Sequence, residues 1–335
     1  MAMAPPAALV RGVRHFWHCQ WRQLMAGLGP ADAQGRYLRP APVFATLPPQ
    51  SADAGRPGGH VLIVGRSCPW AHRAWITWTL RGLQPWVDLQ LVEPDPQAGR
   101  WRFPQPFEGC ATLLDLYRRS GAPAGTRATV PALYGRSGQT IVLSESARLI
   151  ELLNGWPQAS GPDLAPETHR FAIDAWRQRL QGEVNDGVYR CGFARTQAAY
   201  DEAEAALFEC LEEADRSLAV AEANPPPGLE EGGGPWLAGT TKPSLADVVL
   251  FPTLIRLEMV YSPLFGCSRR PLWQLPALWR WRSRFYGLPG VAATCASEHW
   301  RRDYFGSLFP LHPSGIVPAG PDLSTLVQAQ PPALP

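Results

Sequence analysis

The sequence lacks the features that would connect the chain to a membrane or a nucleic acid. Its 335 residues carry a net charge of only +2, and no block of like charge stands out, which argues against nucleic acid as a partner. No apolar run approaches about 18 residues, so we expect no transmembrane helix and no membrane partner. Pro5 and Pro6 interrupt the only apolar stretch at the N-terminus, so we expect no signal peptide.

Cysteine pairs are also missing. The seven cysteines are odd in number and widely spaced, which argues against a disulfide framework and favours a reducing compartment, so we expect a cytoplasmic protein. No partner cluster at zinc-site spacing follows His15, His18 and Cys19, so we expect no metal site. The cysteines are Cys19, Cys68, Cys110, Cys191, Cys210, Cys267 and Cys295.

The length and the 45% hydrophobic content suit two domains with ample cores. Residues 60–155 predict a mixed domain, and residues 166–306 predict a domain of helices after a turn-rich linker. Residues 1–59, rich in Pro, Gly and Ala, are expected to pack as an extension over the first domain. A Pro-rich tail, residues 307–335, is expected to lie along the surface.

Cys68 stands at the most informative position in the chain. It follows an apolar run at residues 61–64, which predicts a buried strand, and it precedes Pro69, a typical first residue of a helix. Free N–H groups and the helix dipole favour a thiolate there. Because Ala71 replaces a second cysteine, redox chemistry would need a thiol from outside the chain. A small buried side chain is the alternative use of such a cysteine, and spacing alone does not separate the two.

The predicted elements around Cys68 have the order βαβαββα of a thioredoxin-like domain. In that fold a cis peptide bond before the third strand, here Val130-Pro131, lies beside the active cysteine. Ser144 and Ser146 flank a predicted helix start, whose N–H groups could hold a carboxylate. The strands are predicted at residues 61–64, 87–92, 129–134 and 140–143, and helices at residues 111–118 and 147–153 in addition to the one that begins at Pro69.

The pattern of the second half of the chain predicts helices. Small and apolar residues recur at helical spacing from Ala199 to Leu218. Ser244 and Asp247 form a variant of the capping box, and Pro252 is expected to kink the helix that follows. The predicted fold class is therefore α/β plus all-α.

This combination resembles a glutathione transferase, and three motifs resemble the glutathionyl-hydroquinone reductases, the Xi class of that family. They are Cys-Pro-Trp-Ala-His-Arg at residues 68–73, Asp-Gly-Val-Tyr-Arg-Cys-Gly-Phe-Ala at residues 186–194 and Gly-Ile-Val-Pro-Ala-Gly-Pro at residues 315–321. The resemblance covers about residues 60 to 322. It implies a thioredoxin-like N-terminal domain, a helical glutathione-transferase C-terminal domain and a homodimer.

The resemblance also implies a reaction. The Cys68 thiolate would attack the sulfur of a glutathionyl-hydroquinone, release the hydroquinone and form a mixed disulfide with glutathione. A second glutathione would then resolve the disulfide, which would explain the missing second cysteine. Glutathione is thus the implied co-substrate, and aromatic glutathionyl conjugates are the implied partners.

The implied glutathione contacts map onto four residues. The backbone of Val130 would pair with the cysteinyl part, Glu145 would take the γ-glutamyl ammonium and Ser146 the carboxylate. Trp101 would lie against glutathione. The alternatives from the residues alone are a plain helix cap for Glu145 and Ser146 and surface-loop packing for Trp101.

Two tyrosines are implied to face the aromatic substrate through their hydroxyl groups, Tyr189 and Tyr304. Ordinary core packing is the alternative for both.

The chain also departs from the family pattern. Leu264 and Gly266 replace a His and a Lys, and Phe305 and Leu308 replace a Tyr and a His. Leu114 falls where some relatives carry a glutathione-binding Arg. These changes leave the sulfur chemistry intact but put the substrate pocket in question.

Two other functions remain open at this point. One is a general thioltransferase or dehydroascorbate reductase that uses Cys68, as in the related Omega class. The other is a non-catalytic transferase-like binding module, against which the joint presence of Cys68, Val130, Glu145 and Ser146 argues.

Overall fold

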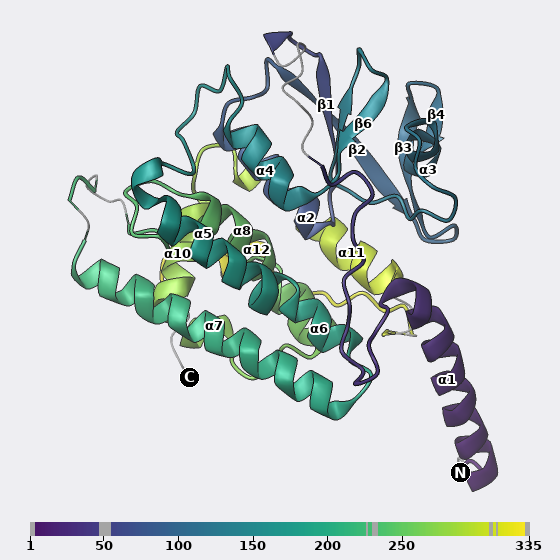
Figure 1. Ribbon diagram of the computed structural model, residues 1–335. Helices are drawn as coiled ribbons and strands as arrows, with labels where there is room; N and C mark the ends of the chain where they lie inside the picture. The colour runs from purple at the N-terminus through teal and green to yellow at the C-terminus, as the bar shows by residue number, and fades with distance from the viewer. Residues whose placement is uncertain are drawn as a thin grey trace.

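The computed structural model describes residues 4–46, 55–225, 227–229, 234–307, 311–312 and 314–331. A sheet with flanking helices forms one part of the molecule, and a group of helices forms the other (Figure 1). The predicted α/β domain followed by a helical domain is confirmed.

Six strands form one mixed sheet in the order β4-β3-β2-β1-β5-β6. Strand β1 is parallel to β2 and antiparallel to β5, so the four strands β2-β1-β5-β6 have the predicted thioredoxin-like arrangement. The strands are β1 His60–Gly65, β2 Val87–Asp95, β3 Arg100–Phe107, β4 Cys110–Thr112, β5 Ala132–Gly135 and β6 Thr140–Leu143.

The hairpin of β3 and β4 was not predicted. It widens the sheet beyond β2. In β3 the aromatic residues are interspersed with arginines and prolines such as Pro104, which hide the pattern of a strand. The helix expected at residues 111–118 therefore begins later, at Leu113, where Thr112 and Asp115 form a capping box. The third predicted strand begins only at Ala132, because Pro131 has no N–H to donate to the ladder.

Helices α2 (Pro69–Leu80), α3 (Leu113–Arg119) and α4 (Ser146–Asn154) flank the sheet (Figure 1). Helices α2 and α4 contact each other, and α2 also contacts α8 of the helical domain. Helix α3 packs on β3, β4 and β6. The sheet thus presents the start of α2 to the helical domain.

Helix α7 is the longest element of the helical domain and runs along its outer edge in Figure 1. The helical elements after α4 are η2 Glu167–His169, α5 Arg170–Arg179, η3 Leu180–Asn185, α6 Gly187–Phe193, α7 Gln197–Ala223, α8 Leu245–Leu254, η4 Leu257–Tyr261, α9 Ser262–Phe265, η5 Leu272–Gln274, α10 Pro276–Tyr286, η6 Ala292–Thr294, α11 Ser297–Ser307 and α12 Leu323–Leu326.

Helix α8 is buried along its whole length. Its predicted capping box is present, and the Asp247 carboxylate also accepts a bond from the indole N–H of Trp281 at 2.8 Å. Leu245–Phe265 is apolar and long enough to cross a bilayer, but 83% of its apolar window is buried inside the molecule, which is typical of a core helix. The regular α-helix ends at Leu254, two residues after Pro252.

The N-terminal extension packs mainly on the helical domain, not over the first domain as expected. Helix α1 (Ala7–Leu28) projects from the molecule in Figure 1. After it, Arg195 donates to the carbonyl of Gly29 at 3.1 Å, and Thr196 donates to that of Gln34 at 2.9 Å. The extension contacts the first domain at Arg39, which lies over the Trp70 ring, and at Phe44, whose carbonyl accepts from the Ser144 N–H at 2.7 Å. We call residues 29–46 the strap, because they join both domains.

Candidate active site

Cys68 lies at the N-terminus of α2, where β1 ends. It is the N-cap residue of the helix, Pro69 occupies the first turn, and the Cys68 N–H donates to the carbonyl of Gly65 at 3.1 Å. The Cys68 thiol lies 3.5 Å from the carbonyl oxygen of Val130. The Val130-Pro131 peptide bond is cis, as expected, so the thiol and the predicted glutathione-binding backbone are neighbours.

The acidity of Cys68 is weaker than the helix position alone suggests. Burial raises the pKa of the Cys68 thiol above its ordinary value, and this outweighs the N–H groups of Ala71 and Trp70 and the charges of Arg256 and Arg39, which all lower it. The expectation that the position favours a thiolate is therefore only partly met. The two arginines are the side chains that work against burial.

Trp101 lies on β3, not in a surface loop. Its indole packs against Gly65, because a Cβ atom built on Gly65 would lie 2.6 Å from the indole ring. The absence of a side chain at Gly65 thus lets Trp101 approach the strand end that leads to Cys68. This places Trp101 beside the candidate nucleophile's turn.

Glu145 and Ser146 begin α4. Glu145 is the N-cap residue, and its Oε2 accepts from the Arg148 N–H at 2.8 Å, so the helix-cap role is present. The Ser146 hydroxyl accepts from the buried guanidinium of Arg73 at 2.5 Å. The cap leaves Oε1 of Glu145 without a hydrogen bond to the described residues, so one carboxylate oxygen can still take a ligand.

A hydrogen-bond chain joins Ser146 to the strap. Arg73 donates to Gln181 at 2.8 Å, Gln181 donates to Asp186 at 3.1 Å, and Asp186 accepts from Arg39 at 3.1 Å. The Arg39 guanidinium carbon also lies 3.5 Å from the centre of the Trp70 ring. The strap therefore reaches the residue two positions after Cys68.

Arg73 is buried within this chain. Burial lowers its pKa to about 9. Its charge faces the start of α4, where the carboxylate of glutathione is predicted to bind.

Three tyrosine hydroxyls meet on the helical-domain side of the site. The hydroxyl oxygens of Tyr189 and Tyr304 are 2.5 Å apart, and those of Tyr261 and Tyr304 are 3.3 Å apart. Tyr189 also stacks on Trp70, with ring centres 6.1 Å apart. Burial raises the pKa of Tyr189 and Tyr304 well above the ordinary value, so both hydroxyls stay protonated and can donate hydrogen bonds.

His72 and Arg256 form the buried junction behind Cys68. Arg256 donates to Nδ1 of His72 at 2.9 Å, which leaves Nε2 to donate to the Thr294 hydroxyl at 2.7 Å. Burial and the charge of Arg256 lower the pKa of His72 well below its usual value, so the imidazole is neutral. The Trp300 ring lies over the Arg256 guanidinium at 4.0 Å.

Sequence reasoning missed four residues of this site: Arg39, His72, Arg73 and Arg256. His72 and Arg73 belong to the motif at residues 68–73, and their position about one turn beyond Cys68 on α2 could have indicated them. No local pattern marks Arg39 or Arg256, because their partners are distant in sequence.

The departures from the family pattern fall in different surroundings. Leu264 is buried on α9, and Gly266 has a φ of 73°, a conformation that favours glycine. Phe305 is buried and meets the His312 ring edge-on. Leu114 is half-buried on α3, and Leu308 lies outside the described residues.

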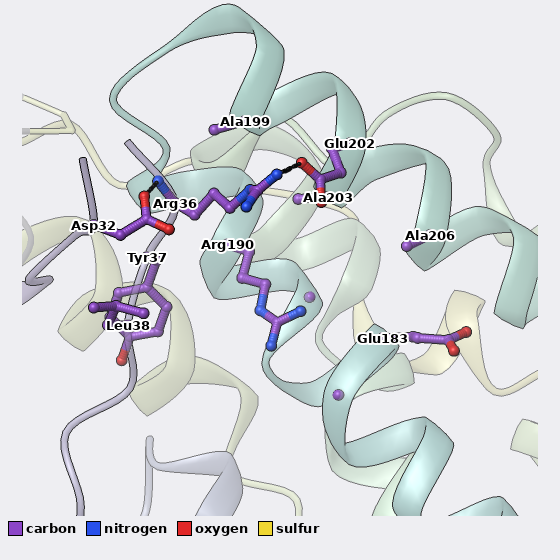
Figure 2. A pocket seen from close by; sticks show the side chains of 12 residues that line it. Asp32, Arg36, Tyr37, Leu38, Glu183, Arg190, Ala199, Glu202, Ala203 and Ala206 are labelled. Carbon is purple, nitrogen blue, oxygen red and sulfur yellow. Dashed lines mark hydrogen bonds and ion pairs between the residues drawn. The ribbon is translucent and has the colours of Figure 1, made fainter. Parts of the chain in front are cut away.

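A separate pocket of about 220 Å³ lies between the strap and the helical domain (Figure 2). Figure 2 shows Arg36 of the strap reaching toward Glu202 of α7, with Nη2 and the carboxylate 2.9 Å apart. None of the predicted site residues lines this pocket, so it is distinct from the Cys68 site.

Comparisons with known proteins agree with this arrangement. The family Glutathione S-transferase, C-terminal domain, matches residues 197–288. The glutathionyl-hydroquinone reductase PcpF of Sphingobium chlorophenolicum is 32% identical over 277 residues, covering 80% of this chain and 84% of PcpF. The glutathionyl-hydroquinone reductase YqjG of Escherichia coli is 31% identical over 333 residues, covering 93% of this chain and 94% of YqjG.

Two solved structures are similar over most of the chain. The glutathione-S-transferase Xi of Phanerochaete chrysosporium aligns with a TM-score of 0.76 and 31% identity, covering 87% of this chain and 94% of that one. The glutathione-bound structure of YqjG aligns with a TM-score of 0.69 and 32% identity, covering 79% and 85%.

Proposed function

Because the chain belongs to the Xi class of glutathione transferases, we propose that it is a glutathione-dependent reductase that removes glutathione from glutathionyl-hydroquinones. The observation that carries the proposal is the position of Cys68. It is a single thiol at a helix N-terminus, next to the Val130 backbone. Tyr189 of the helical domain stacks on Trp70 of the same helix and hydrogen-bonds to Tyr304.

Cys68 is the nucleophile of the proposed reaction. Its thiolate attacks the sulfur of the conjugate, the bond between sulfur and the ring carbon breaks, and the ring carbon takes up a proton, which gives hydroquinone and a Cys68–glutathione disulfide. The thiolate of a second glutathione attacks this disulfide, releasing oxidised glutathione and the Cys68 thiolate. The two electrons gained by the ring come from the two glutathione sulfurs, that of the conjugate and that of the second glutathione, which end as the disulfide.

The glutathione part of the substrate is proposed to bind along the first domain. Val130 offers its backbone beside the thiol, and Trp101 packs against the turn before Cys68. Glu145 and Ser146 receive the γ-glutamyl end, with Arg73 behind Ser146. The glutathione-bound state of YqjG supports glutathione as the co-substrate.

The aromatic part is proposed to face Tyr189 and Tyr304. Both hydroxyls are protonated and share one hydrogen bond, so the pair has one further O–H to donate and lone pairs to accept from the hydroxyl groups of a hydroquinone. The flanking rings of Trp70 and Phe265 offer an apolar wall for the substrate ring.

The proposal is tested by hydroquinone release from a glutathionyl-hydroquinone with excess glutathione. We expect turnover by the wild type and none by Cys68→Ser, with Cys19→Ser as a control at an exposed cysteine on α1. Equal activity with small disulfides or dehydroascorbate would favour the thioltransferase alternative instead. Glutathione binding without turnover of any of these substrates would favour a binding module.

We also propose a cytoplasmic homodimer that forms through the helical domains, as the family resemblance implies. Light scattering coupled to size exclusion would give the mass in solution. A monomer at micromolar concentration would refute the dimer without affecting the proposed chemistry.

A further inference from the structure

Arg256 is a fully buried cation without a carboxylate partner among the described residues. Its Nη1 donates to His72 and to the carbonyl of Pro252 at 2.8 Å, and its Nη2 lies 3.5 Å from the carbonyl of Arg66. All these partners are neutral. Burying an uncompensated charge is costly, so its position at the domain junction calls for a reason.

Arg282 shows how the same chain treats another buried arginine. It is also fully buried, but its guanidinium lies 2.8 Å from the carboxylate of Glu258. The charge of Arg282 is therefore balanced within the helical domain, whereas that of Arg256 is not. Arg282 faces a carboxylate, whereas the hydrogen-bond partners of Arg256 among the described residues are neutral.

The groups that Arg256 holds bracket Cys68. Arg66 is two residues before Cys68 in the turn, and the N–H of His72 donates to the carbonyl of Cys68 at 2.9 Å. Arg256 thus fixes the backbone on both sides of the nucleophile. Cys295 also lies near His72 and Arg256, but burial raises its pKa to about 12, so it stays a thiol at neutral pH. The ionisable group that can supply the missing negative charge within this bracket is therefore the Cys68 thiol.

Other charged and titratable groups also face Cys68, from three further elements. Arg39 of the strap lowers its pKa, as do the N–H groups of α2. Tyr189 of α6 and Tyr261 of η4 interact with the thiol as well, but burial keeps both phenols protonated. Arg256 is the buried one of the two cations, so water screens it less than Arg39.

We propose that Arg256 is a positioning residue whose buried charge is reserved for the Cys68 thiolate. It holds the turn around Cys68 and stabilises negative charge on the sulfur. The thiolate forms before attack and again when it leaves the Cys68–glutathione disulfide, and the second of these steps rests on the proposed function.

The test measures the rate of Cys68 alkylation by iodoacetamide as a function of pH, with Cys68→Ser for background. In Arg256→Gln the midpoint is expected to rise by about one pH unit or more, because a neighbouring opposite charge is removed. At neutral pH this is a fall of about tenfold in rate. Arg256→Lys, which keeps the charge, should stay closer to the wild type.

The matched control removes a balanced buried pair. The double variant Arg282→Gln with Glu258→Gln should leave the midpoint of Cys68 unchanged even if its stability falls. A folded Arg256→Gln variant with the wild-type midpoint would overturn the proposal. Alkylation needs no glutathione conjugate, so a negative result for the proposed function leaves this result readable.

A second measurement covers the case in which Arg256→Gln does not fold. In NMR spectra of the wild type with ¹⁵N-labelled arginine, the chemical shift of one guanidinium signal should change with pH, with the same midpoint as Cys68 alkylation. The shift should vanish in Cys68→Ser and persist in Arg39→Gln. The absence of any arginine signal that follows Cys68 would refute the proposal.

Discussion

Gly65 shows at the scale of one residue how a missing side chain shapes the site. Its hydrogen leaves room for the indole of Trp101, which would otherwise overlap a Cβ atom. Trp101 is predicted to lie against glutathione, so the space at Gly65 is linked to the affinity for the co-substrate.

We expect Gly65→Ala to displace Trp101 and weaken glutathione binding several-fold. Overpacking should also destabilise the fold by about 1–3 kcal/mol. Titration calorimetry with glutathione checks the first effect, and denaturant unfolding checks the second. Gly138→Ala is the control, because its Cβ would lie 3.4 Å from the methyl group of Thr140, an ordinary contact. An unchanged glutathione affinity in Gly65→Ala would contradict the role of Trp101.

The site residues that could be predicted have their informative neighbours close in sequence, whereas the residues that were missed have partners far away in sequence. Cys68 was visible because an apolar run and a proline flank it directly. Arg256 was not, because its contacts with His72 and Arg66 span 184 and 190 residues. Pairings across such distances form only when the two domains meet, so no local pattern carries them.

Elements were predicted best where apolar runs and caps agree. Strand β1, strand β6 and the capping box of α8 were found, because each has a continuous apolar or capping signal. The β3–β4 hairpin was missed, since charged residues and prolines interrupt its pattern. The prediction that the N-terminal extension packs over the first domain was wrong about its main contact, because composition alone does not say which domain a segment covers.

The capping boxes of α8 and α3 allow a test at the scale of the helix. Asp247→Ala removes the cap of a buried helix and leaves the N–H groups of Leu237 and Trp281 without an acceptor. The expected loss is about 3 kcal/mol, against about 1 kcal/mol for Asp115→Ala in the partly exposed box of α3. Denaturant unfolding of both variants checks the ranking, and equal losses would contradict it.

The strap makes a second prediction at this scale. Arg39→Gln removes the stacking on Trp70 and the ion pair with Asp186, so we expect a several-fold fall in kcat/KM for aromatic conjugates. Arg36→Gln is the matched control, because Arg36 pairs with Glu202 at the exposed pocket of Figure 2. Equal falls in kcat/KM in the two variants would contradict a specific role of the Arg39 contact with Trp70.

The whole molecule depends on the junction where α2 meets the helical domain. His72 bonds to Thr294 and Arg256, so one imidazole ties the first domain to two parts of the second. Because its pKa is depressed in the folded protein, the unfolded chain binds a proton that the folded one does not. The stability that this adds is present above the ordinary histidine pKa and is lost as the pH falls below it.

We therefore expect the midpoint of thermal unfolding to fall between pH 7 and pH 5, and to fall less in His72→Gln. His15→Gln, at an exposed position on α1, should follow the wild type. Calorimetry across this pH range checks the difference. Parallel curves for His72→Gln and the wild type would contradict the assignment of this pH dependence to His72.

The burial of α8 has a consequence for how the chain is made. The Phe251 ring stacks on Phe285 of α10, and the cap at Asp247 is completed by Trp281, so the ribosome must add about thirty more residues after α8 before this part of its cover exists. At cellular speeds of synthesis this takes roughly two to six seconds. During that interval α8 can pack on α2, α5 and η3, which precede it in the chain, but its face toward α10 stays uncovered, so we expect chaperones to bind the nascent chain at this stage of its synthesis.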